Sequence, residues 1–238
     1  MVPDITISGG MDTPFGIFVA SNGDIYVDNG NSNGKLEKWS SNATSRTTVM
    51  YVGGRCYGIF LDIYGNIYCS LGDFHRVIRR SSSDSINTTV IIAGNGTSGA
   101  ASNMLSGPRG IFVDVTLKLY VADFYNHRIQ LFLFGQLNGT TIVGSGANGT
   151  IELSFPVGVI LDADEYMFIA DSANKRIVGS GPDGFRCIVG CWDSTGNGIN
   201  PLNDPRGLAF DSYGNLFVVN GPNSQVHKFF LATNSCGK

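Results

Sequence analysis

Charged residues are scarce in this sequence, and long apolar runs are missing from it. Asp, Glu, Lys and Arg make up 15% of the 238 residues, and no run of Lys or Arg exceeds Arg79-Arg80. A nucleic-acid-binding surface needs a clustered basic face, so this pattern and the net charge of −3 disfavour nucleic acid as a partner. The apolar stretches are no longer than strands, whereas a membrane-spanning helix needs about 20 apolar residues. We therefore expect no membrane span.

Histidine is also rare, with only three in the chain. A catalytic zinc site usually needs three convergent ligands. His75 and His127 instead occupy equivalent positions of a repeat described below, and His227 falls within a predicted strand, so we interpret all three as structural. The sequence has no nucleophile elbow, phosphate loop or His–Glu metal motif. We expect no catalytic residue, no metal ligand and no cofactor.

The five cysteines form an odd set, so at least one of them has no partner within the chain. Cys187 and Cys191 would lie about 13 Å apart in an extended strand, which is beyond disulfide reach. They can pair only if the chain turns at Gly190. The pairing of Cys56, Cys69 and Cys236 stays open.

Sequons for N-glycosylation occur five times, against about three expected by chance from the composition. They begin at Asn42, Asn87, Asn95, Asn138 and Asn148. The start, Met1-Val-Pro-Asp, has no apolar signal region. The protein is then either cytosolic or lacks its leader in this sequence. The sequons favour the second interpretation, an extracellular or secreted protein.

Glycine, by contrast, is abundant, and it opens a short apolar strand five times along the chain. The five strands read Pro14-Phe-Gly-Ile-Phe-Val, Cys56-Tyr-Gly-Ile-Phe-Leu, Pro108-Arg-Gly-Ile-Phe-Val, Pro156-Val-Gly-Val-Ile-Leu and Pro205-Arg-Gly-Leu-Ala-Phe. Each is followed by a second strand that bears an aromatic residue. Self-similarity at a period of a few tens of residues is typical of repeat architectures.

One repeat read in detail predicts an antiparallel meander of four strands. In the third repeat, residues 110–114 form a continuous apolar run, 119–123 and 128–133 follow as strands, and Asn138-Gly139 suits a tight turn before a fourth strand. Asp62, Asp114, Asp162 and Asp211 end the first strands. We interpret them as residues that bond their own turn rather than as a carboxylate ring for a cation.

A single sheet of this kind would expose two apolar faces to water. Packing of the sheets around a common axis buries these faces, so the repeats predict an all-β propeller. We expect one domain, 1–238, with repeats at about 11–54, 55–96, 104–146, 152–190 and 202–231. The last repeat lacks a fourth strand. Residues 4–8 resemble the fourth strand of the first repeat, so we predict that they complete the last blade and close a ring of five four-stranded blades.

The loop between the second and third strands suggests a family. Asp123-Phe-Tyr-Asn-His-Arg-Ile129 resembles the NHL repeat, Asp171-Ser-Ala-Asn-Lys-Arg-Ile177 is similar to it, and Leu71 to Val77 keeps its His-Arg pair. The family most often builds six blades, so a six-bladed or truncated six-bladed ring is the alternative. The resemblance implies a protein-interaction module, an RNA-binding domain, an extracellular sensor or a zinc-dependent lyase.

The residue before each repeated glycine is where the blades differ. It is Phe15, Tyr57, Arg109, Val157 and Arg206 in turn, and we expect this position to lie near one mouth of the central channel. Arginines beside aromatics can hold an anionic or aromatic ligand. The other interpretation is that these are strand-start residues whose arginine heads are solvated. Trp192, in the loop 190–204, is a further candidate anchor.

These observations favour a non-catalytic scaffold over an enzyme. We expect it to bind a protein or a small ligand through one face of the propeller, using Phe15, Tyr57, Arg109, Arg206 and Trp192. A metal-dependent lyase or hydrolase of the propeller type is the alternative, and an RNA-binding NHL domain is third.

Overall fold

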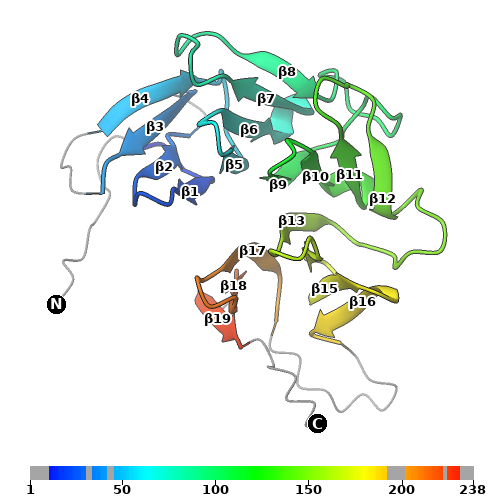
Figure 1. The fold of residues 1–238 in the computed structure, drawn as a ribbon. Coiled ribbons are helices and arrows are strands. Elements are labelled where there is room, and N and C mark those ends of the chain that lie inside the picture. Colours follow the sequence, from blue (N-terminus) through cyan, green and yellow to red (C-terminus); the bar gives the residue numbers. More distant parts are fainter. Residues whose placement is uncertain (1–10, 31–33, 42–45, 192–201, 222–223, 231–238) are drawn as a thin grey trace, which may run out of the picture.

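The repeats of the sequence fold as separate antiparallel sheets, one for each repeat. The computed structural model describes residues 11–30, 34–41, 46–191, 202–221 and 224–230. In it, five sheets are arranged around a common centre as a five-bladed β-propeller (Figure 1). The predicted all-β propeller of five blades is confirmed. The predicted closing strand, residues 4–8, lies outside the described residues.

Each blade is a meander in which neighbouring strands of the chain pair in sequence order. Blade 1 contains β1 (Ile17–Val19), β2 (Ile25–Asp28), β3 (Lys35–Trp39) and β4 (Arg46–Tyr51). Blade 2 contains β5 (Gly58–Leu61), β6 (Ile67–Leu71), β7 (Arg76–Arg80) and β8 (Val90–Ala93). Blade 3 contains β9 (Pro108–Val113), β10 (Leu119–Asp123), β11 (Arg128–Phe132) and β12 (Thr140–Gly144).

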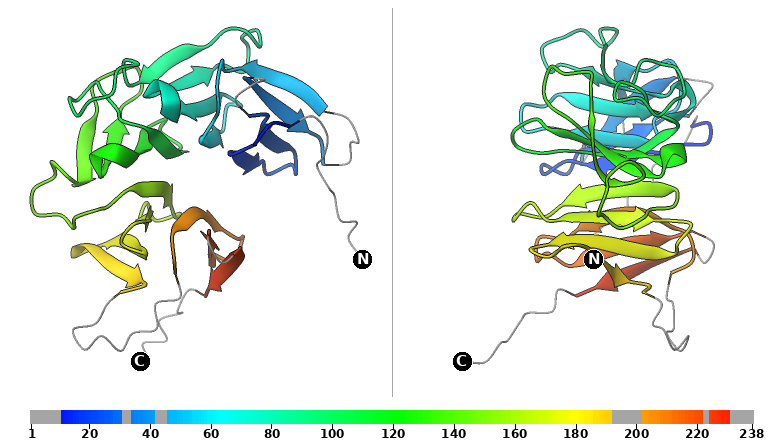
Figure 2. Two further views of the ribbon diagram at one scale, coloured as in Figure 1. Left: turned by 180° about the vertical axis from the view of Figure 1, so that it is seen from behind. Right: turned by 90° about the vertical axis from the view of Figure 1, so that its right-hand side faces the viewer.

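Blades 4 and 5 continue the series. Blade 4 contains β13 (Pro156–Leu161), β14 (Met167–Asp171), β15 (Arg176–Gly181) and β16 (Gly184–Val189), and the described part of blade 5 contains β17 (Pro205–Phe210), β18 (Leu216–Asn220) and β19 (Gln225–Phe229). The first strand of every blade lies nearest the centre, and these strands contact one another in chain order (Figures 1 and 2).

The repeated glycines allow the innermost strands to approach closely. A Cβ on Gly58 would lie 2.6 Å from the carbonyl oxygen of Arg109, and a Cβ on Gly110 would lie 2.7 Å from that of Val157. Both atoms belong to the backbone of the next blade, which cannot move aside cheaply. Glycine is therefore required at these two positions by the contact between blades.

The core lies between the blades rather than inside any one of them. Each of the four junctions between consecutive blades holds its own cluster of buried apolar side chains. At the junction of blades 2 and 3, for example, Tyr68 and Val77 pack with Ile111 and Val113. Because strand side chains alternate between faces, each interior blade contributes to two clusters.

The aspartates that end the first strands hold the turns that follow. Asp62 Oδ1 accepts hydrogen bonds from the backbone N–H groups of Tyr64 and Asn66, both at 2.9 Å. Asp114, Asp162 and Asp211 do the same in their blades. The interpretation of these residues as turn formers is therefore correct, because their carboxylates are bound to their own backbone.

Two disulfides are formed between cysteines that the structure describes. Cys56 pairs with Cys69, and Cys187 pairs with Cys191. The second pair is possible because Gly190 adopts a φ of +73° and ends the strand between the two cysteines. Cys236 lies outside the described residues. Among the residues that the structure describes, no helix is long and apolar enough to cross a membrane.

Candidate functional site

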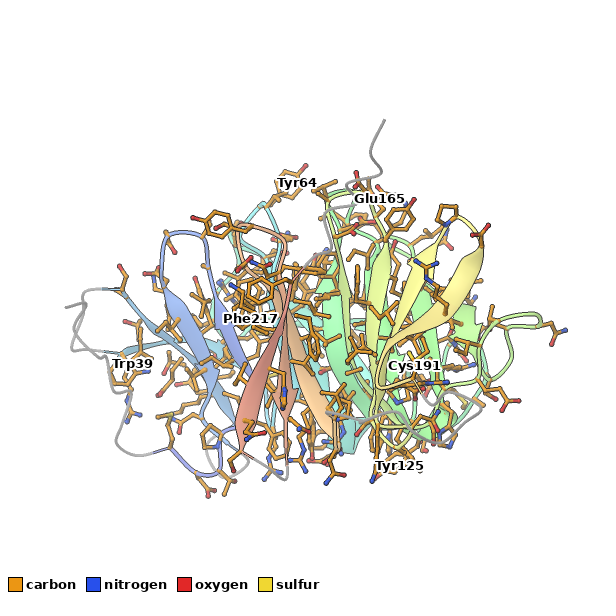
Figure 3. The ribbon with its side chains drawn as sticks, turned by 90° about the horizontal axis from the view of Figure 1, so that it is seen from below. Trp39, Tyr64, Tyr125, Glu165, Cys191 and Phe217 are labelled. Atoms are coloured by element: carbon orange, nitrogen blue, oxygen red, sulfur yellow. A yellow bond between two sulfur atoms is a disulfide. The ribbon has the colours of Figure 1, made fainter. Side chains whose placement is uncertain are left out.

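The blades present two different faces to solvent. One face carries the Asp-held turns between first and second strands, among them those of Tyr64 and Glu165 (Figure 3). The opposite face, here called the mouth face, carries the starts of the innermost strands and the short helices η1 (Gly72–Phe74) and η2 (Phe124–Asn126). Tyr125 of η2 marks this edge in Figure 3. Phe15, Tyr57, Arg109 and Arg206 lie on the mouth face because each stands directly before the repeated glycine, where an innermost strand starts.

Arg109 is held between two aromatic rings. Its guanidinium carbon lies 4.0 Å from the ring centroid of Tyr57 in blade 2 and 4.7 Å from that of Phe124 in η2. Its Nε is buried and has no hydrogen-bond partner among the described residues. Stacking of this kind fixes a planar guanidinium and leaves its N–H edge as the polar group that can bind a ligand.

Phe15 and Arg55 extend the stack toward blade 1. The rings of Phe15 and Tyr57 meet edge to face with 4.9 Å between centroids, and the Arg55 guanidinium lies 5.1 Å from the Phe15 ring. Phe15 remains 51% exposed. The Tyr57 hydroxyl donates a hydrogen bond of 3.0 Å to Asp73 Oδ1, which fixes the ring.

We call Phe15, Arg55, Tyr57, Arg109 and Phe124 the aromatic–arginine cluster. It joins three blades through two cations and three rings. Three of its members were predicted from the sequence, whereas Arg55 and Phe124 were missed. A signal for Phe124 was available, because in a meander the loop after the second strand returns to the end of the blade at which the first strand starts.

Arg206 and Val157, two further residues from the same repeat position, are not part of this cluster. Arg206 forms an ion pair of 2.8 Å with Asp204 and is otherwise exposed. Val157 packs in the apolar cluster between blades 4 and 5. Trp192 and most of the loop 190–204 lie outside the described residues. Of the two arginines predicted at the mouth, only Arg109 makes described contacts with the aromatic residues.

The histidines of the repeat connect one blade to the next. His127 adopts a left-handed conformation with φ of +54°, and its Nδ1 accepts a hydrogen bond of 3.1 Å from the backbone N–H of Phe155. His75 does the same for Gly107, also at 3.1 Å. Both rings therefore hold the segment that leads into the following innermost strand, which explains why the residue recurs.

A second connection uses a buried ion pair. Asp123 and Arg128 face each other across β10 and β11, with 2.8 Å between Oδ2 and Nε. The remaining guanidinium N–H groups of Arg128 donate to backbone carbonyls of Ala100, Ala101 and Met104. The loop 94–107 is thus held to blade 3 by the side chain of Arg128.

Asp28, the corresponding carboxylate of blade 1, has no arginine opposite it. Its cross-strand neighbour is Leu36. Asp28 is fully buried, one oxygen accepts a bond from the Phe15 N–H, and the other has no hydrogen-bond partner in the described residues. Burial raises the pKa of Asp28 above its ordinary value.

No metal site is evident from the side chains present. Within residues 11–30, 34–41, 46–191, 202–221 and 224–230, no three His, Cys, Asp or Glu side chains gather in a way that could hold an ion. The third histidine, His227, lies 3.3 Å from Asn220 Nδ2 through its Nε2. His227 belongs to β19 of blade 5, whereas His75 and His127 follow η1 and η2 in blades 2 and 3.

The fold defines the protein as a β-propeller, and its third blade carries a family signature. Residues 105–132 match the family model described as NHL repeat. This match, together with the propeller architecture, confirms the resemblance to NHL-repeat β-propellers. No curated protein matches the sequence.

Solved structures show the same fold at low sequence identity. A chain from a nidogen–laminin complex aligns with a TM-score of 0.70 and 18% identity, over 92% of this chain and 76% of that one. Virginiamycin B lyase from Staphylococcus aureus aligns with a TM-score of 0.61 and 13% identity, over 93% of this chain and 71% of that one. An auxiliary nutrient binding protein from Bacteroides thetaiotaomicron aligns with a TM-score of 0.70 and 16% identity, over 94% of this chain and 60% of that one. At these identities the likeness establishes the fold alone.

Proposed function

We propose that the protein is a non-catalytic binding module that recognises another protein through the aromatic–arginine cluster on its mouth face. The observation that carries this proposal is the position of Arg109 between Tyr57 and Phe124, at 4.0 and 4.7 Å. Arginine and aromatic residues dominate the binding energy of protein interfaces when they are held in place before the partner arrives.

The chemistry of the cluster indicates what it would bind. A stacked guanidinium offers paired N–H donors to a carboxylate, and the exposed edge of Phe15 offers an apolar surface beside them. Tyr57 is held by Asp73, so its ring needs little further ordering on binding. A partner segment with an acidic residue next to an apolar or aromatic residue fits this arrangement. Arg206, farther round the face, would contribute a second and weaker contact.

The structural neighbours are compatible with such a role. One was solved in a complex of nidogen and laminin, and others are nutrient binding proteins. Lyases with the same fold are also among them. A metal-dependent lyase or hydrolase is not favoured by any donor set in the described residues. RNA binding is not favoured by the acidic net charge.

A selection of peptides would test the proposal. Short random peptides displayed on phage would be selected on the whole protein, and binding of the enriched peptides would be measured by titration. We expect peptides with Asp or Glu beside an aromatic residue, and an affinity loss of at least about tenfold for Arg109→Ala. Arg109→Lys should also bind weakly, because an ammonium group does not reproduce the stacked fork.

Arg186→Ala is the matched control, because Arg186 is an exposed arginine on blade 4. It should leave the affinity unchanged. Equal binding of the selected peptides by the wild type, Arg109→Ala and Phe15→Ala would contradict the proposed site, and so would a selection that enriches nothing.

A further inference from the structure

An apolar groove lies on the outer rim between blades 2 and 3, apart from the mouth-face cluster. It has a volume of about 330 Å³ and runs between β8 and the hairpin that joins β11 to β12. Val90 and Ile91 line one wall, and Leu133, Phe134 and Leu137 line the other. All five are exposed, Phe134 by 59% and Leu137 by 54%. Arg79 also lines the groove, with its guanidinium carbon 5.3 Å from the centroid of the Phe134 ring.

Two sequons flank the groove. Asn138 directly follows Leu137 in the hairpin wall, and Asn87 lies three residues before Val90 of the strand wall. Both asparagines are exposed. Asn138 accepts a long bond of 3.4 Å from Ser102 Oγ through Oδ1, but in the part of the chain that the structure describes neither side-chain Nδ2 donates a hydrogen bond. The atom that would carry a sugar is therefore free in both residues.

Blade 4 lacks both features in the same hairpin. There β15 and β16 are joined by Pro182-Asp183, with neither a sequon nor a large apolar residue. In blade 3 the equivalent hairpin has both, Asn138 as well as Phe134 and Leu137. Between β3 and β4 of blade 1, the sequence has a sequon at Asn42 but no large apolar residue, so blade 3 differs from both in having the two features together.

The cysteine pairs indicate the compartment in which such a modification takes place. Cys56–Cys69 and Cys187–Cys191 are both disulfides. Disulfides persist mainly in secreted and extracellular proteins, and these are the proteins in which Asn-X-Ser/Thr sequons are used.

We propose that Asn87 and Asn138 carry N-linked oligosaccharides, and that these cover the apolar groove between blades 2 and 3. Each attachment forms a bond between the asparagine Nδ2 and the anomeric carbon of an oligosaccharide carried on a polyprenyl pyrophosphate. The bond from that carbon to the pyrophosphate oxygen breaks, the lipid pyrophosphate leaves, and one Nδ2 proton is released to solvent. A bulky, strongly hydrated group on each side of the groove keeps its apolar walls from associating with other molecules.

The test begins with the whole chain, secreted from cultured eukaryotic cells behind a cleavable signal. Glycopeptide mass spectrometry measures the occupancy of each site in the wild type, Asn87→Gln, Asn138→Gln and the double variant. We expect both sites to be occupied in the wild type, with each substitution removing one glycan. An unmodified Asn87 or Asn138 in the wild type would overturn the proposal.

Covering of the groove is measured on wild-type protein that has already folded. An apolar fluorescent dye is titrated before and after native digestion with a peptide N-glycosidase. Dye binding should rise after digestion, and the added substitutions F134S and L137S should abolish the rise. Asn148→Gln, whose sequon lies at the other end of β12, should not change dye binding.

Strong dye binding by the fully glycosylated protein, lost in F134S and L137S, would show that the groove is open. The groove would then be a surface for another protein rather than a glycan-covered one. An unchanged signal after complete removal of the glycans would also contradict the proposal.

Discussion

Blades 1 and 3 begin with the same four residues, Gly-Ile-Phe-Val, yet the side chains meet different surroundings. Ile111 in β9 is 6% exposed, whereas Ile17 at the same position of β1 is 63% exposed. Ile111 faces blade 2 and is buried there. In β1 it is Phe18 that packs toward blade 2, and Ile17 lies on the opposite face of that strand. An identical segment is therefore core in one blade and surface in another.

Blade 3 also has more polar connections than blade 1. In blade 3, Asp123 is paired with Arg128, and this arginine also fastens the loop that arrives from blade 2. In blade 1, Asp28 faces Leu36, and its buried carboxyl forms no ion pair with any residue that the structure describes. An interior blade thus has a complete set of repeat interactions, whereas the first blade has part of the set.

The largest effect is expected from giving blade 3 the pair found in blade 1. Arg128→Leu leaves the buried carboxylate of Asp123 without its cation and frees the loop 94–107. We expect the free energy of unfolding to fall by about 3–5 kcal/mol, as measured by urea denaturation. Arg186→Leu, at an exposed position, should change it by no more than about 0.5 kcal/mol. Equal effects of the two substitutions would contradict this interpretation of Arg128.

The next effect tests the two identical segments directly. Ile111→Ala removes a buried side chain from the junction of blades 2 and 3 and should cost about 2–5 kcal/mol of unfolding free energy. Ile17→Ala removes an exposed one and should cost about 0.5 kcal/mol or less. Both can be measured in the same denaturation series. A loss at Ile17 as large as that at Ile111 would mean that β1 is covered in solution.

The smallest effect concerns the buried carboxyl of Asp28 in blade 1. Because burial raises the pKa of Asp28 above 3.8, the folded protein binds this proton more tightly than the unfolded chain does. The stability that comes from this tighter proton binding is fully present at pH values below 3.8, and it is lost as the pH rises through the pKa of Asp28 in the folded protein. Asn lacks this titration, so Asp28→Asn should be more stable relative to the wild type at about pH 7 than at about pH 3.

Asp211→Asn serves as a control of opposite sign. Hydrogen bonds from Asn215 and from backbone N–H groups, together with Lys228, lower the pKa of Asp211 to about 2. The stability that this carboxylate supplies is present above 3.8 and is lost as the pH falls through about 2. Thermal melting of both variants across this range should give trends of opposite direction, and parallel trends would contradict the assigned shifts.

Much of the fold was accessible from the sequence because its signals are local and repeated. The glycine at the start of each innermost strand, the aspartate that follows four of these strands and the loop with the His-Arg pair each act within a few residues or on the adjacent blade. The predicted roles of Asp114 in its turn and of Gly190 in allowing the Cys187–Cys191 disulfide follow from backbone geometry alone.

The candidate site was predicted in part. Phe15, Tyr57 and Arg109 were found because they share one position of the repeat and differ in residue type. Phe124 and Arg55 were missed because the first comes from a loop of the same blade as Arg109, and the second precedes a strand that starts with cysteine instead of proline. The contact of Phe124 with Arg109 lies within blade 3, whereas that of Arg55 with Phe15 depends on how blades 1 and 2 are placed.

The sequence by itself determined the strands, the turns and their order, since these depend on backbone preferences and on alternation along the chain. The tertiary structure decided which side chains are buried and which cations are stacked. The reason is visible in Gly-Ile-Phe-Val: its own conformation is a strand in both blades, but the burial of Ile111 and the exposure of Ile17 depend on whether another blade lies against that face.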